Sequence, residues 1–267
     1  EGAVGSAPVG RGRLQPGRLR PEWRRSVRDG REAAPDSRGG EEVRRGVGRV
    51  VRAHDITADR TVALKLFPSW IDGEAVTGEF RALFDIHHRA VVRVFGVELT
   101  RGFGHYLVTE FVEGPTLRKR ILDGQFFAEE AAVGAFKRTL EALDEFHPTL
   151  DGIGERGIVH RDIKPENLIV APEDRGLVLV DFGIASSATG GTPVGSRGYR
   201  PPGALADVSE PDLDLFAVGI SLHEALTGKN PYLEGEQILD TPVIDVELSG
   251  PMQALLRKAV APDKTTR

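Results

Sequence analysis

The 267-residue chain contains no cysteine. This absence excludes disulfide bonds and zinc sites with cysteine ligands, and it fits a reducing compartment, so we expect a cytoplasmic location. No run of about 18 apolar residues occurs, so no membrane-spanning segment is expected. The chain starts at Glu1 with neither a signal peptide nor an initiating methionine, which indicates a fragment of a longer protein.

Charge is unevenly distributed along the chain. The net charge is -5, yet the first 45 residues are rich in Arg, Gly and Pro, and the remainder is acidic. Gly and Pro interrupt residues 1–42 every few positions, so this stretch is predicted to be a disordered tail. A basic tail is able to bind nucleic acid or a membrane surface. A solvated linker is the simpler interpretation, and nucleic acid is not among the partners that we expect.

The remaining sequence changes from strand-like to helical character. Strand-like apolar runs occupy residues 47–51, 61–67, 91–97 and 105–112, and Gly114-Pro115 then breaks the pattern. Helical spacing relates three sets of residues: Phe80, Leu83, Phe84 and His87; Val133, Phe136, Leu140 and Leu143; and Leu215, Ile220 and Leu222. The pattern predicts an α+β fold of two lobes, residues 43–112 and 113–267.

Two motifs carry the strongest functional signal. The string HRDIKPEN occupies residues 160–167, and Asp181-Phe182-Gly183 follows a strand-like run at 177–180. They resemble the catalytic and metal-binding loops of eukaryotic-type (Hanks-type) serine/threonine protein kinases. The resemblance implies a small N-lobe with an antiparallel sheet and one helix. It also implies a larger helical C-lobe, which here ends before its last helix. The excess of Arg over Lys, with abundant Ala and Gly, indicates a bacterial member of the family.

The resemblance implies a role for each polar residue of these motifs. Phosphoryl transfer depends mostly on positioning and charge stabilisation. Asp162 is expected to accept the proton of the attacking hydroxyl, and Lys164 to offset charge on the γ-phosphate of ATP. Asn167 and Asp181 are expected to bind Mg²⁺, which prefers oxygen ligands. Lysine two residues after the catalytic aspartate is typical of kinases that act on Ser or Thr hydroxyls of proteins.

A further lysine is expected to contact the nucleotide. Lys65 ends the string Val62-Ala63-Leu64-Lys65, which is similar to the V-A-I-K strand of kinases. By this resemblance Lys65 binds the α/β-phosphates and pairs with a glutamate on the following helix. Glu79 is the best candidate for that partner, and Glu74 lies nearby as the alternative.

The glycine-rich loop of the family is only partly present. The pattern G-x-G-x-x-G-x-V places Val43, Arg45 and Gly48 where three glycines usually stand, with Gly46 as an extra glycine. Glycine lets backbone N–H groups approach phosphate without a Cβ in the way. We assign Val43, Gly46 and Gly48 to the cover of the nucleotide and expect that cover to be loosened or reshaped. An ordinary hairpin is the alternative, and no Walker P-loop motif occurs in the chain.

Other positions complete the expected scaffold of the site. Thr109, Glu110 and Val112 match the gatekeeper and hinge, where backbone groups bind adenine. The resemblance implies that three apolar residues sandwich the adenine ring: Val50, Ala63 and Ile169. It also implies an apolar stack that links the lobes, formed by Leu83, Val94, His160 and Phe182. Asp214 matches the helix aspartate that holds the backbone of the catalytic loop.

Residues 195–202 resemble the end of a kinase activation segment. Ser196 is expected to bridge Asp162 and Lys164. Thr192 falls where many kinases carry an activating phosphate, for which Arg161 is the expected partner. The usual glutamate of this segment is replaced by Gly203, so its usual partner, Arg267, needs another acceptor.

Three functions compete for this sequence. An active Ser/Thr kinase agrees with intact Lys65, Asp162, Asn167 and Asp181. A pseudokinase that acts as a nucleotide-binding scaffold agrees with the altered glycine loop and with Gly203. A small-molecule phosphotransferase has the same Asp–Asn spacing but generally lacks a peptide-docking segment of this kind. We favour the first: phosphorylation of protein Ser or Thr hydroxyls that depends on ATP and Mg²⁺.

Overall fold

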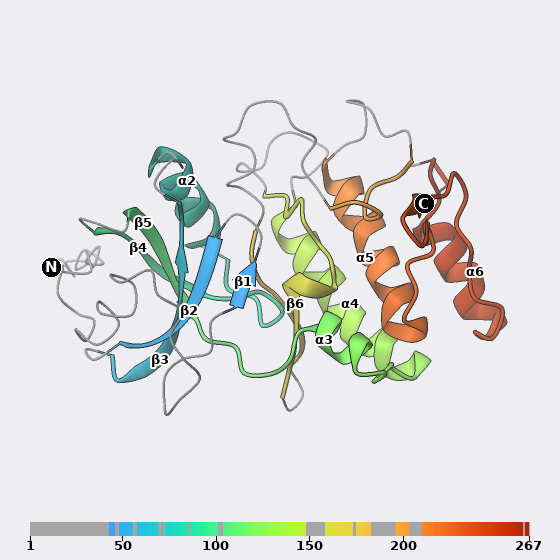
Figure 1. Cartoon of the computed structure of the whole chain (residues 1–267), viewed down its shortest axis with the longest axis horizontal. Helices are drawn as coiled ribbons and strands as arrows, with labels where there is room; N and C mark the ends of the chain where they lie inside the picture. The colour runs from blue at the N-terminus through green and yellow to red at the C-terminus, as the bar shows by residue number, and fades with distance from the viewer. Residues whose placement is uncertain are drawn as a thin grey trace, which may run out of the picture.

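The computed structural model describes most of the chain after the N-terminal tail. The described residues are 43–45, 48–55, 58–68, 71, 73–84, 86–100, 104–147, 158–172, 175–182, 196–202, 210–263 and 265–266. A lobe built on a β-sheet precedes a larger, mostly helical lobe along the long axis of the molecule (Figure 1). The tail at 1–42, with Gly46, Thr192, Gly203 and Arg267, lies outside the described residues.

The first lobe is one antiparallel sheet with one helix. Its strands have the order β1-β2-β3-β5-β4. The bounds are β1 Val43–Arg45, β2 Gly48–Asp55, β3 Arg60–Leu66, β4 Val94–Thr100 and β5 Gly104–Glu110. Helix α2, Gly73–Phe84, packs against β4 and β5. This arrangement confirms the strand-rich first part that the sequence predicts.

The alternation of β3 explains how one strand serves two faces. Successive side chains of a strand point to opposite faces. Val62, Leu64 and Leu66 are buried on one face. There they pack with Tyr106 and Val108 of β5. The intervening residues of β3 therefore face the side on which α2 packs, and the nucleotide-binding lysine expected from the sequence is one of them.

One strand prediction is displaced from the observed strand. The sequence predicts a strand at 91–97, whereas β4 is Val94–Thr100. Val91 instead forms an isolated parallel bridge with Leu179. Val92 N donates to Leu179 O over 2.9 Å, and Leu179 N donates to Ala90 O over 2.8 Å. The apolar run therefore serves two lobes: its first residues pair with the second lobe and the rest enter the first.

The second lobe is built around helix α5, Glu210–Thr227, whose residues Phe216–Leu226 are all buried. Helices α4, Glu129–Phe146, and α6, Gly250–Ala259, pack against it. A Cβ on Gly219 would lie 2.9 Å from Val260 Cγ1, so glycine permits the close approach of α5 and α6. The shorter elements are α3 Leu117–Leu122, the 3-10 helix η1 Pro165–Asn167, β6 Leu168–Ala171, β7 Gly176–Leu179, β8 Leu233–Glu234 and β9 Gln237–Ile238.

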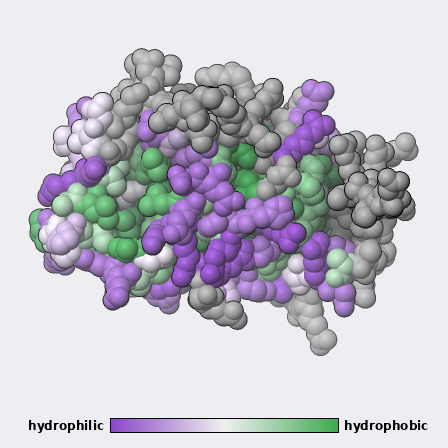
Figure 2. Space-filling view, turned by 180° about the vertical axis from the view of Figure 1, so that it is seen from behind, coloured by the Kyte–Doolittle hydropathy of each residue, from purple (hydrophilic) through white to green (hydrophobic). Residues whose placement is uncertain are grey.

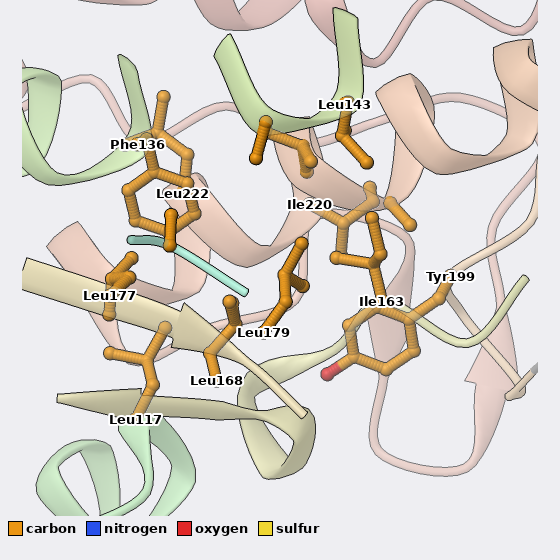
Figure 3. Close-up of a cluster of buried hydrophobic side chains, with 14 of the residues drawn as sticks. Leu117, Phe136, Leu143, Ile163, Leu168, Leu177, Leu179, Tyr199, Ile220 and Leu222 are labelled. Atoms are coloured by element: carbon orange, nitrogen blue, oxygen red, sulfur yellow. The ribbon is translucent and has the colours of Figure 1, made fainter. Parts of the chain in front are cut away.

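The core of this lobe lies between α4, α5 and the β6–β7 hairpin (Figure 3). Leu168, Leu177 and Leu179 of the hairpin are each 0% exposed. They point toward Phe136 and Leu222, which come from the two helices (Figure 3). The helices thus hold one face of the β6–β7 hairpin. This packing also fixes the positions of η1, which precedes the hairpin, and of residues 180–182, which follow it.

The apolar face of α4 differs from the predicted one. Phe136 and Leu143 are buried, but Val133 and Leu140 are 46% and 41% exposed. The buried stripe instead includes small residues, because alanines allow α4 to lie close to its neighbours: Ala132, Ala135, Phe136, Thr139, Ala142, Leu143 and Phe146. The same error affects Phe84 and Leu215, which are also exposed, at 48% and 40%. Helical spacing found these helices but not the side that each one buries.

Polar residues are prominent both on one face of the molecule (Figure 2) and in its helices. Seen from behind, a band of hydrophilic residues runs down the middle of the molecule, with hydrophobic surface beside it (Figure 2). Within the described part of the chain, every helix is too short or too polar to cross a bilayer.

Candidate active site

Strand register gathers the expected nucleotide-binding residues on one face of the sheet. Val50 pairs with Lys65, and Ala63 pairs with Thr109. Directly opposite residues in an antiparallel pair share a face, so these four side chains lie on the side of the sheet that α2 also covers. Val50, Ala63 and Thr109 are partly exposed on this face.

Lys65 reaches from this face to the second lobe. Its Nζ lies 3.1 Å from Asp181 Oδ1 and 3.5 Å from the carbonyl oxygen of Phe182. The side chains of Lys65 and Asp181 are only 16% and 15% exposed. Because both charges are largely removed from water, their attraction is stronger than that of a surface pair. The arrangement brings a cation and a carboxylate from separate lobes to one point.

The catalytic-loop residues form a second cluster. Lys164 Nζ donates to Asp162 Oδ2 over 2.7 Å. Asn167 Nδ2 donates to Asp162 O over 2.8 Å and to Asp162 Oδ2 over 3.0 Å. Asn167 is 2% exposed and belongs to η1, which begins at Pro165. Since the amide nitrogen of Asn167 binds Asp162, its amide oxygen is directed away from Asp162.

Ser196 joins this cluster from the far end of the activation segment. Its Oγ donates to Asp162 Oδ1 over 2.9 Å and accepts from Lys164 Nζ over 2.7 Å. This confirms the bridge that the sequence predicts. Both carboxylate oxygens of Asp162 therefore accept hydrogen bonds, one from Ser196 and the other from Lys164 and Asn167.

Asp214 of α5 holds the backbone that leads to Asp162. Its Oδ2 accepts from His160 N over 2.7 Å, and its Oδ1 accepts from Arg161 N over 2.8 Å. Arg161 has φ of 67°, a conformation that is costly for a residue with a side chain. Two charge-assisted hydrogen bonds offset that cost. The prediction that Asp214 braces the catalytic loop is confirmed, and Asp214 Oδ2 also lies 3.0 Å from His147 Nε2.

The apolar stack that links the lobes is also present. His160 and Phe182 are 0% and 1% exposed, and their ring centroids lie 4.4 Å apart. Leu83 of α2 and Val94 of β4 belong to the same buried cluster as Phe182. Burial lowers the pKa of His160 below its usual value. The ring is therefore neutral near pH 7 and packs as a largely apolar group, with Nε2 3.1 Å from Val180 O.

The chain passes between the lobes at residues 110–116. Val112 is buried with Val92, Ala171 and Val178, and Ile169 packs beside them. Glu110 pairs with Val62, so its side chain lies on the sheet face opposite Lys65. Only the backbone of Glu110 is therefore available to the face that carries Lys65.

Several predicted site residues are described only in part. Val43 and Gly48 lie in the β1–β2 hairpin, opposite Val50 and Arg45 respectively. Gly46 lies outside the described residues, as does the side chain of Glu79, whose backbone is in α2. The pairing of Lys65 with Glu79 and the covering role of the hairpin stay predictions.

One cluster beside the catalytic loop was not predicted from the sequence. Arg118 of α3 donates to Glu166 Oε1 over 2.8 Å, to Tyr199 OH over 2.5 Å and to Glu224 Oε2 over 2.9 Å. Tyr199 OH also donates to Glu224. Burial raises the pKa values of Glu224 and Tyr199, and Arg118 opposes both shifts. Glu166 and Tyr199 lie within recognised motifs, but Arg118 and Glu224 carry no spacing signal that would join them.

Comparison with known proteins agrees with this geometry. The family model described as "Protein kinase domain" matches residues 44–265. The chain is 32% identical over 199 residues to the serine/threonine-protein kinase PknL of Mycobacterium tuberculosis, which covers 70% of this chain and 48% of PknL. It is 30% identical over 216 residues to human calcium/calmodulin-dependent protein kinase type IV, covering 77% of this chain and 44% of that protein. The chain thus spans about half the length of these curated relatives.

A solved structure shares the fold. The crystal structure of Rad53 1-466 in complex with AMP-PNP matches with a TM-score of 0.69 and 24% sequence identity. The match covers 85% of this chain and 60% of that one. The two-lobed architecture expected from the sequence is therefore confirmed.

Proposed function

Because this chain belongs to the protein kinase family, we propose that it transfers the γ-phosphoryl group of ATP, with Mg²⁺, to Ser or Thr hydroxyls of protein substrates. One observation carries the proposal: Lys65 and Asp181 meet between the lobes, and Asp162, Lys164 and Asn167 are joined by hydrogen bonds in the adjoining loop. The proposal assigns the lobes different tasks. The sheet lobe holds the nucleotide, and the helical lobe carries out the proton transfer.

Nucleotide binding is assigned to the face that carries Lys65. Val50 and Ala63 lie on that face, and Ile169 packs beside buried Val112 of the connecting segment. We assign the adenine ring to the space between these apolar side chains. The backbone at Glu110 and Val112 supplies its hydrogen bonds, beside Thr109. Lys65 binds the α/β-phosphates, where an ammonium group offsets phosphate charge.

The chain offers suitable ligands for a magnesium ion. Mg²⁺ prefers oxygen ligands and keeps few from the protein, since substrate phosphates supply others. The carboxylate of Asp181 and the amide oxygen of Asn167 are such ligands, and the amide nitrogen of Asn167 is already directed to Asp162. When bound, Mg²⁺ neutralises charge that develops on the phosphates.

Asp162 is the proposed proton acceptor. The oxygen of a substrate hydroxyl forms a bond to the γ-phosphorus, and the bond from that phosphorus to the β–γ bridging oxygen breaks, so that ADP leaves. The hydroxyl proton passes to Asp162. Lys164, 2.7 Å from Asp162, offsets charge on the transferred group and keeps the carboxylate oriented.

Ser or Thr as the acceptor is supported by Lys164, which stands two residues after Asp162 as in kinases of that specificity. The similarity to PknL of Mycobacterium tuberculosis and Mycobacterium bovis, both serine/threonine-protein kinases, agrees with it. Phosphorylation of Thr192 as an activating step stays a prediction, because Thr192 lies outside the described residues. The cytoplasmic location expected from the lack of cysteine likewise stays a prediction.

A labelled-phosphate assay tests the proposal. The purified chain is incubated with γ-labelled ATP, Mg²⁺ and a mixture of peptides, and phosphorylated positions are mapped by mass spectrometry. We expect label on Ser and Thr, loss of transfer in Asp162→Asn, and retained ATP binding in that variant by calorimetry. Lys137→Ala, which changes an exposed lysine of α4, is the matched control. Equal transfer rates for Asp162→Asn and the parent chain would overturn the assignment, and ATP binding without any transfer would favour the scaffold alternative.

A further inference from the structure

An arginine on the β6–β7 turn binds two separate segments at the passage between the lobes. Arg175 Nε donates to Arg89 O over 2.8 Å. Its NH2 donates to Glu110 Oε2 over 2.9 Å, and its NH1 donates to Glu110 Oε1. The two side chains are 26% and 28% exposed. A bidentate arginine–carboxylate pair has a defined geometry, unlike most surface ion pairs.

Glu110 links this arginine to the first lobe. It is the last residue of β5, and its backbone N–H donates to Arg93 O over 2.8 Å. Its Oε2 also accepts from Arg93 N over 3.4 Å. Because the side chain of Glu110 lies on the sheet face opposite Lys65, Arg175 contacts it from the side away from the proposed nucleotide position. Arg175 and Arg93 thus bind the carboxylate of Glu110 on the sheet face opposite Lys65.

The segment around Arg89 is attached to the second lobe. Val92 and Ala90 exchange backbone hydrogen bonds with Leu179 of β7. Beneath them, Val92 packs with Val112, Ala171 and Val178 in one buried cluster. Arg175 therefore joins the end of the N-lobe sheet to a body formed by β7 and the segment before β4. A rotation of the lobes that moves Glu110 away from β7 therefore breaks this contact.

We propose that Arg175 is a positioning residue that, through Glu110, fixes the hinge and restrains opening of the nucleotide cleft. The inference rests on the proposed function, because it assigns regulation to the same site. A restrained hinge holds the adenine-binding backbone in one conformation and lowers the entropy lost on binding. It also slows the opening through which ADP leaves, a step that often limits turnover. Loss of Arg175 therefore weakens nucleotide binding while leaving the chemical step intact.

The test separates nucleotide affinity from turnover. Arg175→Ala is expected to raise the Kd for ADP and the KM for ATP about threefold to tenfold, while kcat stays within about twofold or rises. Arg175→Lys retains the charge but not the bidentate geometry. Its Kd for ADP and KM for ATP are expected to lie between those of the parent chain and those of Arg175→Ala. Lys119→Ala, which breaks an exposed ion pair with Asp123 on α3, is the control and leaves both parameters unchanged.

A double-mutant cycle with Glu110→Gln identifies the partner. Coupling between Arg175→Ala and Glu110→Gln in the Kd for ADP supports the proposal, and additive effects overturn it. Faster hydrogen exchange of amides 109–114 in Arg175→Ala also supports it. Unchanged nucleotide affinity, or equal losses of kcat and kcat/KM together with a lower Tm, overturns it. Because ADP binding is measured directly, the role of Arg175 is tested even if the parent chain transfers no phosphate. Absence of transfer would count against the proposed function alone.

Discussion

Lys65 Nζ of the sheet lobe lies 3.1 Å from Asp181 Oδ1 of the helical lobe, although 116 positions separate the two residues in the sequence. Both side chains are largely buried, so the loss of either charge leaves the other with weaker compensation than a surface charge would receive from water. We expect Lys65→Met to lower the rate of phosphoryl transfer by about 10²-fold or more, because phosphate charge loses its partner. Single-turnover assays with saturating Mg²⁺ and ATP measure this effect.

Asp181→Asn provides the complementary change at the same contact. It retains size and one oxygen but removes the charge that meets Lys65 and the proposed metal. We expect a comparable loss of transfer, with partial recovery at high Mg²⁺ only for this variant. Equal dependence on Mg²⁺ in the Lys65 and Asp181 variants would contradict the separate roles.

Asp214 is predicted to control both stability and turnover. Its carboxylate is 1% exposed and accepts from the backbone of His160 and Arg161. Asp214→Ala leaves one buried and one partly buried N–H group without these acceptors and removes the support for the positive φ of Arg161. We expect a loss of about 2–4 kcal/mol in the free energy of unfolding and a lower kcat. Urea denaturation with parallel kinetics tests this, and unchanged stability would show that the brace is dispensable.

The Arg118 cluster yields a prediction about buried charge. Glu224 is 3% exposed and Arg118 is its charged partner. Arg118→Ala leaves that acid buried with one fewer donor and is expected to cost about 3–5 kcal/mol. The double variant Arg118→Met with Glu224→Gln removes both charges and is expected to recover part of that loss. A double variant less stable than Arg118→Ala in thermal denaturation would be inconsistent with this account.

His223 gives the stability a pH dependence of defined sign. Burial lowers its pKa below the usual value. The hydrogen bond to the backbone of Lys229 and the charge of Asp245 oppose this shift, and the charge of the Lys229 side chain adds to it. Its Nε2 accepts from Asp245 N over 3.3 Å, which requires the neutral ring, while its Nδ1 donates to Lys229 O over 2.7 Å. Below the unfolded-state pKa of about 6.5 the unfolded chain binds more protons, so the free energy of unfolding falls as the pH falls from about 7 to 5.

Comparison of variants isolates this contribution from other titrating groups. His223→Gln is expected to lose about 1–2 kcal/mol at pH 7 and to show a shallower decline toward pH 5. His54→Gln changes a half-exposed ring and serves as the control. If the free energy of unfolding depends on pH with the same slope in His223→Gln and in the parent chain, the pH dependence comes from other groups. Buried His160 is the first candidate among them.

The sequence predicts the catalytic loop well because its chemistry requires particular residue types at fixed spacing. Asp162, Lys164 and Asn167 lie within six positions, and short-range geometry then brings them together. The Ser196 bridge and the Asp214 brace could also be predicted, since each belongs to a recognised motif. Strand alternation was sufficient to place Lys65 and Ala63 on one face.

Contacts without a motif could not be predicted in this way. Arg118 meets Glu224 across 106 positions, and Arg175 meets Glu110 across 65. Arginine is common in this chain and gives no signal of which carboxylate it will reach. The buried face of α4 was misjudged because alanine, rather than the larger Val133 and Leu140, faces the core. Packing density decided that face, and hydrophobicity alone does not predict it.

The hydroxyl of Ser196 affects how an acceptor hydroxyl can approach Asp162. That hydroxyl already donates to Asp162 Oδ1, and two nitrogen donors bind the other oxygen. Under the proposed function, an acceptor hydroxyl that donates its proton to Asp162 therefore either displaces one of these donors or shares a carboxylate oxygen with it. The bridge of Ser196 thus couples the position of the activation segment to the hydrogen-bonding capacity that Asp162 retains for an acceptor.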